Sequence, residues 1–219
     1  VNMGYHCAIY SREMDKRSIF QRICCIEGVD SSSWTRQRFT NGESAIITRI
    51  ASNKTTPLRV YDDLSNINDI CARIRLDHIR FGTRVVIVDY IQLVRGDKKE
   101  GREREVSGVA WQLKELALAL QITILAPSQL NKDMQARESG DIENHCDQML
   151  VIAKSSKDDE EDKGRRLVKI TKNRNGESDR RCIYQFTGAN YSFREVEETE
   201  ADIIPAKESK QYSKRHADN

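Results

Sequence analysis

A chain of 219 residues is long enough for one sizeable hydrophobic core, and a single large α/β domain is the natural expectation. The 36 basic residues are balanced by 34 acidic ones and leave a formal charge of +2, so any surface that binds nucleic acid has to be local. The six cysteines form no Cys-x-x-Cys pair, which argues against a zinc site and predicts buried thiols in a reducing compartment.

The first residues of the chain already follow a strand pattern. The chain begins with Val1 rather than methionine, and we expect a fragment whose natural amino-terminal portion precedes it. With no signal peptide and no apolar run long enough to span a bilayer, we also expect a cytoplasmic protein. A strand is predicted over residues 5–10 and a helix over 16–27, with Asp15 as its N-cap. Glu13 lies in the turn between them, where its simplest role is to stabilise the helix dipole.

Two more helical segments and a strand follow. Residues 31–53 form a helical excursion that contains a capping box, Thr40-Asn-Gly-Glu43. A short strand over 57–61 leads to a helix that ends at Gly82, and its predicted inward positions are Ile67, Ile70, Cys71, Ile74 and Ile79. The order strand, helix, strand predicts a parallel, doubly wound arrangement.

The most informative stretch is Arg-Val-Val-Ile-Val-Asp-Tyr-Ile-Gln-Leu-Val, residues 84–94. The β-branched run Val85–Val88 predicts a strand buried on both faces of a parallel sheet. Asp89 ends that run, at the edge where open α/β sheets bind ligands and where an acid can hold Mg²⁺ beside a nucleotide. The alternative is an acid that merely opens a turn, and this stretch alone does not decide between the two.

A charged segment and a clear helix come next. Residues 95–105 contain two glycines and many charges, which predicts a solvated loop. Residues 106–120 keep one apolar face over four turns and predict a helix. A strand over 122–126 then leads into Pro127-Ser128-Gln129, which places a polar side chain just past another strand.

Further strands are predicted in the rest of the chain. Strands are expected over residues 148–153 and 167–171, with a charged connection between them and a polar turn that begins at Lys172. Two short strands, over 182–186 and 191–193, form an edge hairpin. From Glu195 onward the polar, charge-mixed composition predicts a disordered tail.

Glu13, Asp89 and Gln129 each follow a separate predicted strand, so one sheet would bring all three to the same edge. At this point the sequence resembles the DnaB-type replicative helicases, whose motor domain has a RecA-like core. The matching stretches are Ser-Arg-Glu-Met (11–14), Ile-Val-Asp-Tyr-Ile-Gln-Leu (87–93), Ser-Gln-Leu (128–130), Arg-Glu-Ser-Gly-Asp-Ile-Glu (137–143) and Lys-Asn-Arg-Asn-Gly (172–176). Five such stretches in the family's order, across residues 5–195, make a strong combined signal.

The resemblance implies an α/β fold of the RecA-like kind, with a mostly parallel twisted sheet flanked by helices and a C-terminal antiparallel edge hairpin. It implies a partial motor domain over residues 1–195 and a tail over residues 196–219. It further implies an ATP-dependent DNA helicase from a bacterium or phage, which acts in DNA replication as a homohexamer with ATP and Mg²⁺ and moves 5′ to 3′ on single-stranded DNA. Primase and a helicase loader would be partners through parts not in this chain, and no membrane is implied.

The resemblance also assigns roles to the residues that end the strands. Glu13 matches the catalytic base that polarises the attacking water, and Asp89 matches the Walker B acid that organises Mg²⁺. Gln129 matches the residue that senses the γ-phosphate. Lys172 and Arg174 match basic residues that reach the neighbouring subunit's nucleotide, where charge neutralisation assists phosphoryl transfer.

Contacts with DNA are implied at two segments. Arg137, Glu138 and Gly140 match the loop that holds single-stranded DNA in the central channel of the ring. The charged loop 95–105 would be a second channel loop, with Arg102 and Arg104 as its candidate DNA-binding side chains. A few cations and backbone amides per subunit, repeated around a ring, can follow a phosphate backbone without a strongly basic protein.

Two departures from the family's pattern limit these expectations. The glycine-rich phosphate loop that ends in Gly-Lys-Thr or Gly-Lys-Ser is absent, so we expect the 219-residue chain alone neither to bind ATP tightly nor to hydrolyse it. Arg12 stands where the family has an apolar residue, which could alter the turn that holds Glu13. Two alternatives therefore stay open: a RecA-like recombinase or regulatory ATPase, and a non-catalytic truncated homologue that joins or regulates helicase rings.

Overall fold

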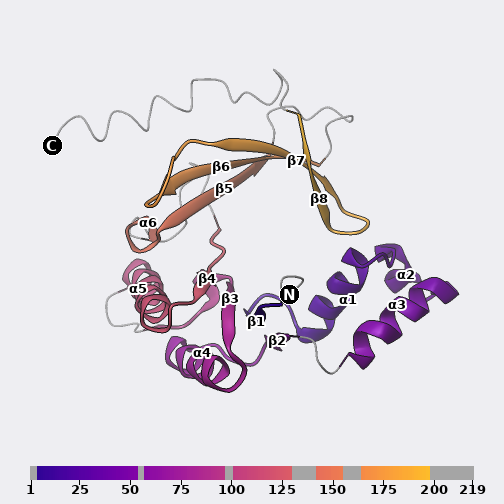
Figure 1. Cartoon of the computed structure of the whole chain (residues 1–219), viewed down its shortest axis with the longest axis horizontal. Helices are drawn as coiled ribbons and strands as arrows, with labels where there is room; N and C mark the ends of the chain where they lie inside the picture. The colour runs from indigo at the N-terminus through magenta and orange to yellow at the C-terminus, as the bar shows by residue number, and fades with distance from the viewer. Residues whose placement is uncertain (1–3, 54–56, 97–100, 130–141, 155–163, 198–219) are drawn as a thin grey trace.

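The computed structural model describes residues 4–53, 57–96, 101–129, 142–154 and 164–197. These residues form two separate four-stranded sheets with helices against the first one (Figure 1). The elements, in chain order, are β1 (His6–Ser11), α1 (Lys16–Ile26), α2 (Ser31–Arg36), α3 (Asn41–Ser52), β2 (Leu58–Tyr61), α4 (Ile67–Phe81), β3 (Thr83–Asp89), η1 (Ile91–Leu93), α5 (Arg102–Leu120), β4 (Thr123–Leu125), α6 (Ile142–His145), β5 (Gln148–Lys154), β6 (Arg165–Asn173), β7 (Arg181–Thr187) and β8 (Ser192–Val196).

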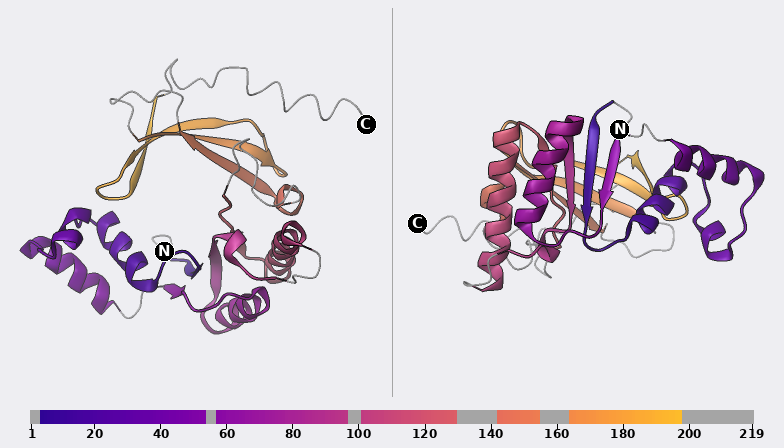
Figure 2. Two further views of the ribbon diagram at one scale, coloured as in Figure 1. Left: turned by 180° about the vertical axis from the view of Figure 1, so that it is seen from behind. Right: turned by 90° about the horizontal axis from the view of Figure 1, so that it is seen from below.

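The first sheet is wholly parallel and has the strand order β2-β1-β3-β4. The predicted strand–helix–strand order is therefore confirmed, and β3 lies between β1 and β4. Since parallel strands end at a common edge, the segments that follow these three strands meet at one side of the sheet. Figure 2 shows the strands side by side, with α4 and α5 running along them.

The hydrophobic core lies on the face of this sheet that α4 and α5 cover. Tyr10, Val86 and Val88 are essentially fully buried there, against a cluster that includes Ile70, Ile74, Leu113 and Leu116. Alternate residues of a strand point to opposite faces, and on the other face Val85 and Ile87 are only half-buried. The prediction that residues 85–88 are buried on both faces is thus wrong, because both covering helices pack on the same side.

Local signals fix α4 between two well-defined ends. Asn66 is its N-cap, with a side-chain oxygen that accepts the Asn68 N–H at 2.8 Å, and Gly82 ends it in the left-handed conformation at φ 65°. Four of its five predicted inward residues are buried, but Ile79 is 78% exposed and that part of the prediction is wrong. Ile79 does not continue the 3.6-residue spacing of the buried positions, so its side chain lies off the apolar face of α4.

Helices α1, α2 and α3 lie together at the β2 end of the parallel sheet (Figure 1). Asp15 caps α1 as predicted, by accepting the Ser18 N–H at 2.7 Å. The predicted capping box of α3 is also present, because Thr40 and Glu43 exchange hydrogen bonds. Local sequence therefore determined where these helices begin.

The second sheet is antiparallel, in the order β5-β6-β7-β8, and is larger than the predicted edge hairpin. Alternation along a strand does not reveal which sheet the strand joins, so the sequence could not separate β5 and β6 from the parallel sheet. The connection between β7 and β8 contacts the first helices: Ser31 N–H donates to the Ala189 carbonyl at 3.1 Å, and the Arg22 guanidinium lies over the Tyr191 ring.

The cysteines only partly follow the prediction of buried thiols. Cys7, Cys24, Cys25 and Cys71 are buried and in no disulfide, whereas Cys146 is half-buried and Cys182 is exposed on β7. Among the described helices, none is both long and apolar enough to cross a membrane. The strand β8 extends to Val196, and residues 198–219 lie outside the described residues, so the predicted tail stays a prediction.

Candidate active site

The turn between β1 and α1 presents Glu13 at the carboxyl edge of the parallel sheet. Ser11, the last residue of β1, pairs in register with Asp89, the last residue of β3. The Arg12 N–H donates to the Asp89 carbonyl at 2.7 Å, and inside the turn the Ser11 hydroxyl oxygen accepts the Met14 N–H at 3.0 Å. The exposed Glu13 side chain is therefore carried by a turn that is held against the end of β3.

Arg12 does not disrupt this turn, although it stands where an apolar residue was expected. Its Nη1 donates to the Asp62 carbonyl just past β2 at 3.1 Å, while its buried Nε has no hydrogen-bond partner among the described residues. Asp62 in turn accepts the Lys16 N–H and pairs with Lys16 Nζ, both at 2.9 Å. Arg12 thereby ties the turn to the end of β2, which itself holds the start of α1.

Asp89 is a half-buried acid at the end of β3. Burial raises its pKa, the nearby Glu13 carboxylate raises it further, and the Arg22 guanidinium of α1 partly offsets both effects. A cation beside Asp89 would relieve the unfavourable burial of its charge and the repulsion from Glu13. Arg22 was not singled out by the sequence, because no motif distinguishes it from the other basic residues of α1. The Asp89–Tyr90 peptide bond is cis.

Gln92 connects the end of β3 with the end of β4. Its buried side chain donates to the Ser128 hydroxyl at 2.8 Å and accepts the Gln129 N–H at 3.3 Å. The Ile91 N–H adds a backbone hydrogen bond to the Pro127 carbonyl at 3.0 Å. The exposed Gln129 is thus held beside the segment that follows Asp89. Sequence reasoning matched Gln92 as part of a motif but gave it no role.

The donor atoms at this edge fit Mg²⁺. Asp89 and Glu13 offer carboxylate oxygens and Gln129 an amide oxygen, and Mg²⁺ in nucleotide sites is held by one or two carboxylates together with phosphates. Asp89 would hold the ion, directly or through water. The Gly-x-x-x-x-Gly-Lys-Ser/Thr turn, which commonly cradles phosphates beside such an ion, is not among the 219 residues.

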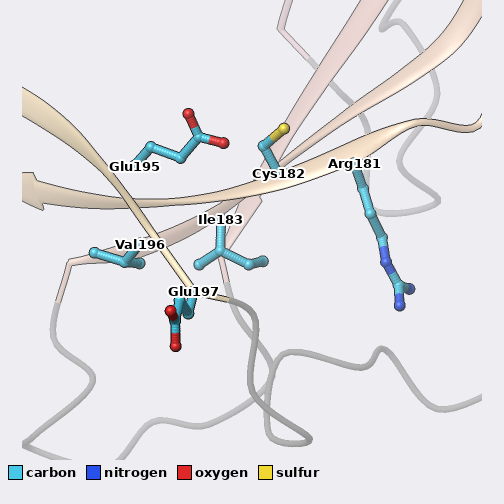
Figure 3. A pocket seen from close by; sticks show the side chains of 6 residues that line it. All are labelled: Arg181, Cys182, Ile183, Glu195, Val196 and Glu197. Carbon is cyan, nitrogen blue, oxygen red and sulfur yellow. The ribbon is translucent and has the colours of Figure 1, made fainter.

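A surface pocket elsewhere on the molecule is not part of this site. It lies on β7 and β8 and is lined by Arg181, Cys182, Ile183, Glu195, Val196 and Glu197 (Figure 3). None of the strand-end residues contributes to it. Its carboxylates point in different directions and Arg181 points away from both, so no convergent polar set is formed.

The structure places Lys172 and Arg174 at the end of β6, away from Asp89. Lys172 Nζ donates to the Glu143 carbonyl at 2.5 Å, and Arg174 Nη1 pairs with Asp147 at 3.2 Å. Neither cation is among the charges that shift the pKa of Asp89. Within one chain the predicted site residues therefore form two groups, one at the parallel sheet edge and one at the corner between α6 and β5.

The predicted DNA-binding residues belong to two segments of the chain. Arg137, Glu138 and Gly140 lie outside the described residues. Arg102 and Arg104 belong to the first turn of α5, so the prediction that the loop continues to residue 105 is wrong. The helix begins there because Gly101 supplies an N-cap at φ 92° and acidic residues occupy the first turn, where the helix dipole favours them.

Buried Glu105 explains why this turn is ordered. It accepts the Gly96 N–H at 2.8 Å and pairs with Arg102 Nη1 at 2.6 Å, while Arg102 Nη2 donates to the Gln92 carbonyl. Arg102 is thus tied to the protein itself. In the sequence, nothing distinguishes the buried Glu105 from the other charged residues of this segment.

Comparison with known proteins agrees with this geometry. The model of the DnaB-like helicase C-terminal domain family matches residues 1–195. The chain belongs to this family. Its fold is RecA-like, as the parallel sheet and its flanking helices also indicate.

Individual relatives of this DnaB-like domain cover the same region. The replicative DNA helicase DnaB of Geobacillus stearothermophilus is 27% identical, over 77% of this chain and 41% of the relative. The replicative DNA helicase DnaB of Leifsonia xyli is 31% identical, over 76% of this chain and 40% of the relative. The DnaB-like chain thus spans about two fifths of the length of the curated relatives that it matches.

A solved structure shares the fold. A DnaB-like replicative helicase, whose structure was described with its interactions with primase, superimposes with a TM-score of 0.76 at 22% identity. The match covers 90% of this chain and 53% of that one. At this level of identity the similarity concerns the arrangement of the elements.

Proposed function

We propose that this DnaB-like domain is part of the motor of an ATP-dependent replicative DNA helicase that moves 5′ to 3′ on single-stranded DNA as a homohexamer. The observation that carries the proposal is the meeting of Glu13, Asp89 and Gln129 at the ends of three adjacent parallel strands. This edge is where α/β sheets bind ligands. Phosphoryl transfer needs the groups found there: a base for water, an acid for Mg²⁺ and a polar contact near the γ-phosphate.

Each residue has a specific task in this proposal. Glu13 accepts the proton of the water that attacks the terminal phosphate, and its exposure at the sheet edge leaves it accessible to that water. Asp89 holds Mg²⁺, which supplies charge neutralisation at the phosphates when ATP is bound. Gln129 hydrogen-bonds near the γ-phosphate, and Gln92 keeps it in place.

Arg174 and Lys172 act on the nucleotide of the adjacent subunit. Their separation from Asp89 within one chain agrees with such a role, because a finger residue has to reach outward. An arginine that neutralises transition-state charge raises the rate by about 10³–10⁵-fold. Primase and a loader are proposed partners of the longer protein, and Arg137, Glu138 and Gly140 are proposed contacts with single-stranded DNA.

The second candidate is a non-catalytic homologue, whose complete chain would lack a phosphate-binding turn. A homologue of this kind could join helicase rings without hydrolysing ATP. The two proposals differ in what the gene encodes immediately before Val1. An in-frame Gly-Lys-Thr or Gly-Lys-Ser turn supports the enzyme, and an initiator codon directly before Val1 supports the regulator.

The test of the proposed function is strand separation. The gene product from its natural start is incubated with ATP, Mg²⁺ and partial DNA duplexes that carry a single-stranded tail at either the 5′ or the 3′ end. Unwinding that depends on the 5′ tail supports the proposal, and unwinding from the 3′ tail would reject the polarity. The 219-residue chain alone is the matched control, and it should release no strand.

A further inference from the structure

Arg174 is held by a carboxylate that also binds a lysine. Asp147 Oδ1 lies 3.2 Å from Arg174 Nη1, and Asp147 Oδ2 lies 2.5 Å from Lys114 Nζ on α5. The Arg174 N–H also donates to the Asp147 carbonyl at 2.8 Å. The backbone and the side chain of Arg174 are therefore both hydrogen-bonded to Asp147, at the corner between α6 and β5.

The corner itself is anchored to the protein core. His145 of α6 lies 3.3 Å from the Ser107 hydroxyl of α5, and Lys172 is bonded to the Glu143 carbonyl. The Lys114 side chain is mostly buried, at 16% exposed, whereas that of Arg174 is 55% exposed. The lysine is the fixed member of the group and the arginine is the outward one.

Charge explains why a lysine belongs here. An arginine and a single carboxylate form a neutral pair, which attracts a distant phosphate more weakly than an unpaired arginine does. Lys114 and Arg174 share Asp147, so the three groups together keep one net positive charge. The hydrogen bond from Lys114, with the charges of Arg174 and Lys172, holds the pKa of Asp147 below its usual value, so the carboxylate is ionised at neutral pH.

We infer that Asp147 is a positioning residue that orients Arg174 toward the neighbouring subunit, and that Lys114 preserves the positive charge of the pair. This inference rests on the proposed function. Arg174 has five side-chain N–H donors, and among the described residues its side chain is bonded only to Asp147, through one terminal nitrogen, which leaves donors for a phosphate. Loss of orientation is costly, because a misplacement of about 1 Å can lower a rate by about 100-fold.

Mixed rings of the gene product from its natural start test this inference. Alone, Asp147→Ala should lower the kcat of ATP hydrolysis about 10- to 100-fold with little change in KM, because it acts on the finger and leaves nucleotide binding intact. Mixed with Glu13→Gln, it should recover activity, since some subunit boundaries then contain an intact Glu13 and an intact finger. Mixed with Arg174→Ala, it should not recover.

Opposite results overturn the inference. If Asp147→Ala recovers activity when it is mixed with Arg174→Ala, or recovers none when it is mixed with Glu13→Gln, Asp147 acts in the nucleotide site of its own subunit. An unchanged kcat in Asp147→Ala alone would show that Asp147 has no role in hydrolysis. Failure of Glu13→Gln and Arg174→Ala to recover each other would reject the cross-subunit finger and the inference with it. If Glu13→Gln and Arg174→Ala do recover activity together, the cross-subunit finger stands and the other mixtures test only the role of Asp147.

Two further variants separate positioning from folding. Lys114→Met should lower kcat and Lys114→Arg should restore it, whereas a role in packing alone would leave kcat unchanged in both. Glu27→Gln is the matched control, because Glu27 pairs with Arg49 at 2.8 Å and its side chain is as exposed as that of Asp147, 42% against 43%. It should leave kcat unchanged, and a loss as large as that in Asp147→Ala would reject a specific role.

Discussion

The side-chain oxygen of Gln92 accepts the backbone N–H of Gln129 at 3.3 Å, which joins the segment after β3 to the segment after β4. Gln92 also donates to the Ser128 hydroxyl at 2.8 Å. One buried amide therefore fixes the spacing between the proposed Mg²⁺ ligand, Asp89, and the proposed γ-phosphate contact.

Replacing Gln92 by leucine should weaken hydrolysis more than binding. Gln92→Leu removes the hydrogen bonds that position Gln129, so we expect kcat for ATP in the gene product to fall about tenfold or more with little change in KM. Gln112→Leu is the control, because Gln112 is a partly buried glutamine of α5 without a hydrogen bond among the described residues. Equal effects of the two variants on kcat would contradict the role of Gln92.

Asp89 should destabilise the metal-free fold at neutral pH. Its pKa in the folded chain is raised above 3.8, first by burial and then by Glu13, so ionised Asp89 opposes folding above that pH. Asp89→Asn should therefore raise the melting temperature of the metal-free chain at pH 7. The gain should shrink as the pH falls through the folded pKa and vanish well below 3.8, where Asp89 is protonated in both states. A gain that persists in acid would mean that charge is not its cause.

Glu43 has the opposite pH dependence. It accepts hydrogen bonds from the Asp30 and Thr40 N–H groups and from the Ser33 hydroxyl. The Thr40 and Asp30 N–H groups, followed by the Ser33 hydroxyl, lower its pKa from 4.5 to about 2. Its contribution to stability is therefore complete above pH 4.5 and is lost as the pH falls through about 2.

Glu43→Gln should consequently unfold the region of α2 and α3 more easily at pH 7, and the difference from the parent chain should shrink toward pH 2. The probe is the fluorescence of Trp34, which contacts Phe39 with ring centroids 4.9 Å apart. Both chains carry Trp111→Phe so that Trp34 is the only tryptophan. A difference in urea midpoint that is the same at pH 7 and pH 3 would contradict this account.

A buried hydrogen-bond cluster should stabilise the core of the parallel sheet. The fully buried Asp77 accepts the hydroxyl of Tyr10 at 3.0 Å and that of Tyr61 at 2.9 Å. Tyr10→Phe leaves one acceptor site of Asp77 unsatisfied, and we expect the free energy of unfolding in urea to fall by about 1–3 kcal/mol. Tyr184→Phe, which removes a hydroxyl with no hydrogen bond among the described residues, should cost less than about 0.5 kcal/mol.

Much of the parallel sheet could be predicted because its signals are local. The run Val85–Val88, the cap at Asp15 and the stop at Gly82 each fix an element within a few residues. Polar residues that directly follow strands led to Glu13, Asp89 and Gln129, and their meeting needed only the rule that parallel strands end together.

The rest depends on contacts between distant residues. The membership of β5 and β6 in a second sheet follows from pairing partners, which the alternation along one strand does not encode. Glu105 reads as one charge in a charged run, and only its buried contact with the Gly96 N–H reveals a structural role. Asp147 and Arg174 are 27 positions apart, and no motif joins them.

The most direct test of the central claim is the rate of ATP hydrolysis by the gene product from its natural start, measured with and without single-stranded DNA. Glu13→Gln and Arg174→Ala are measured alongside the parent protein. We predict hydrolysis that DNA stimulates in the parent and that falls by about 10³-fold or more in Arg174→Ala and to near background in Glu13→Gln. Undiminished hydrolysis in either variant, or none in the parent protein, would contradict the proposed motor.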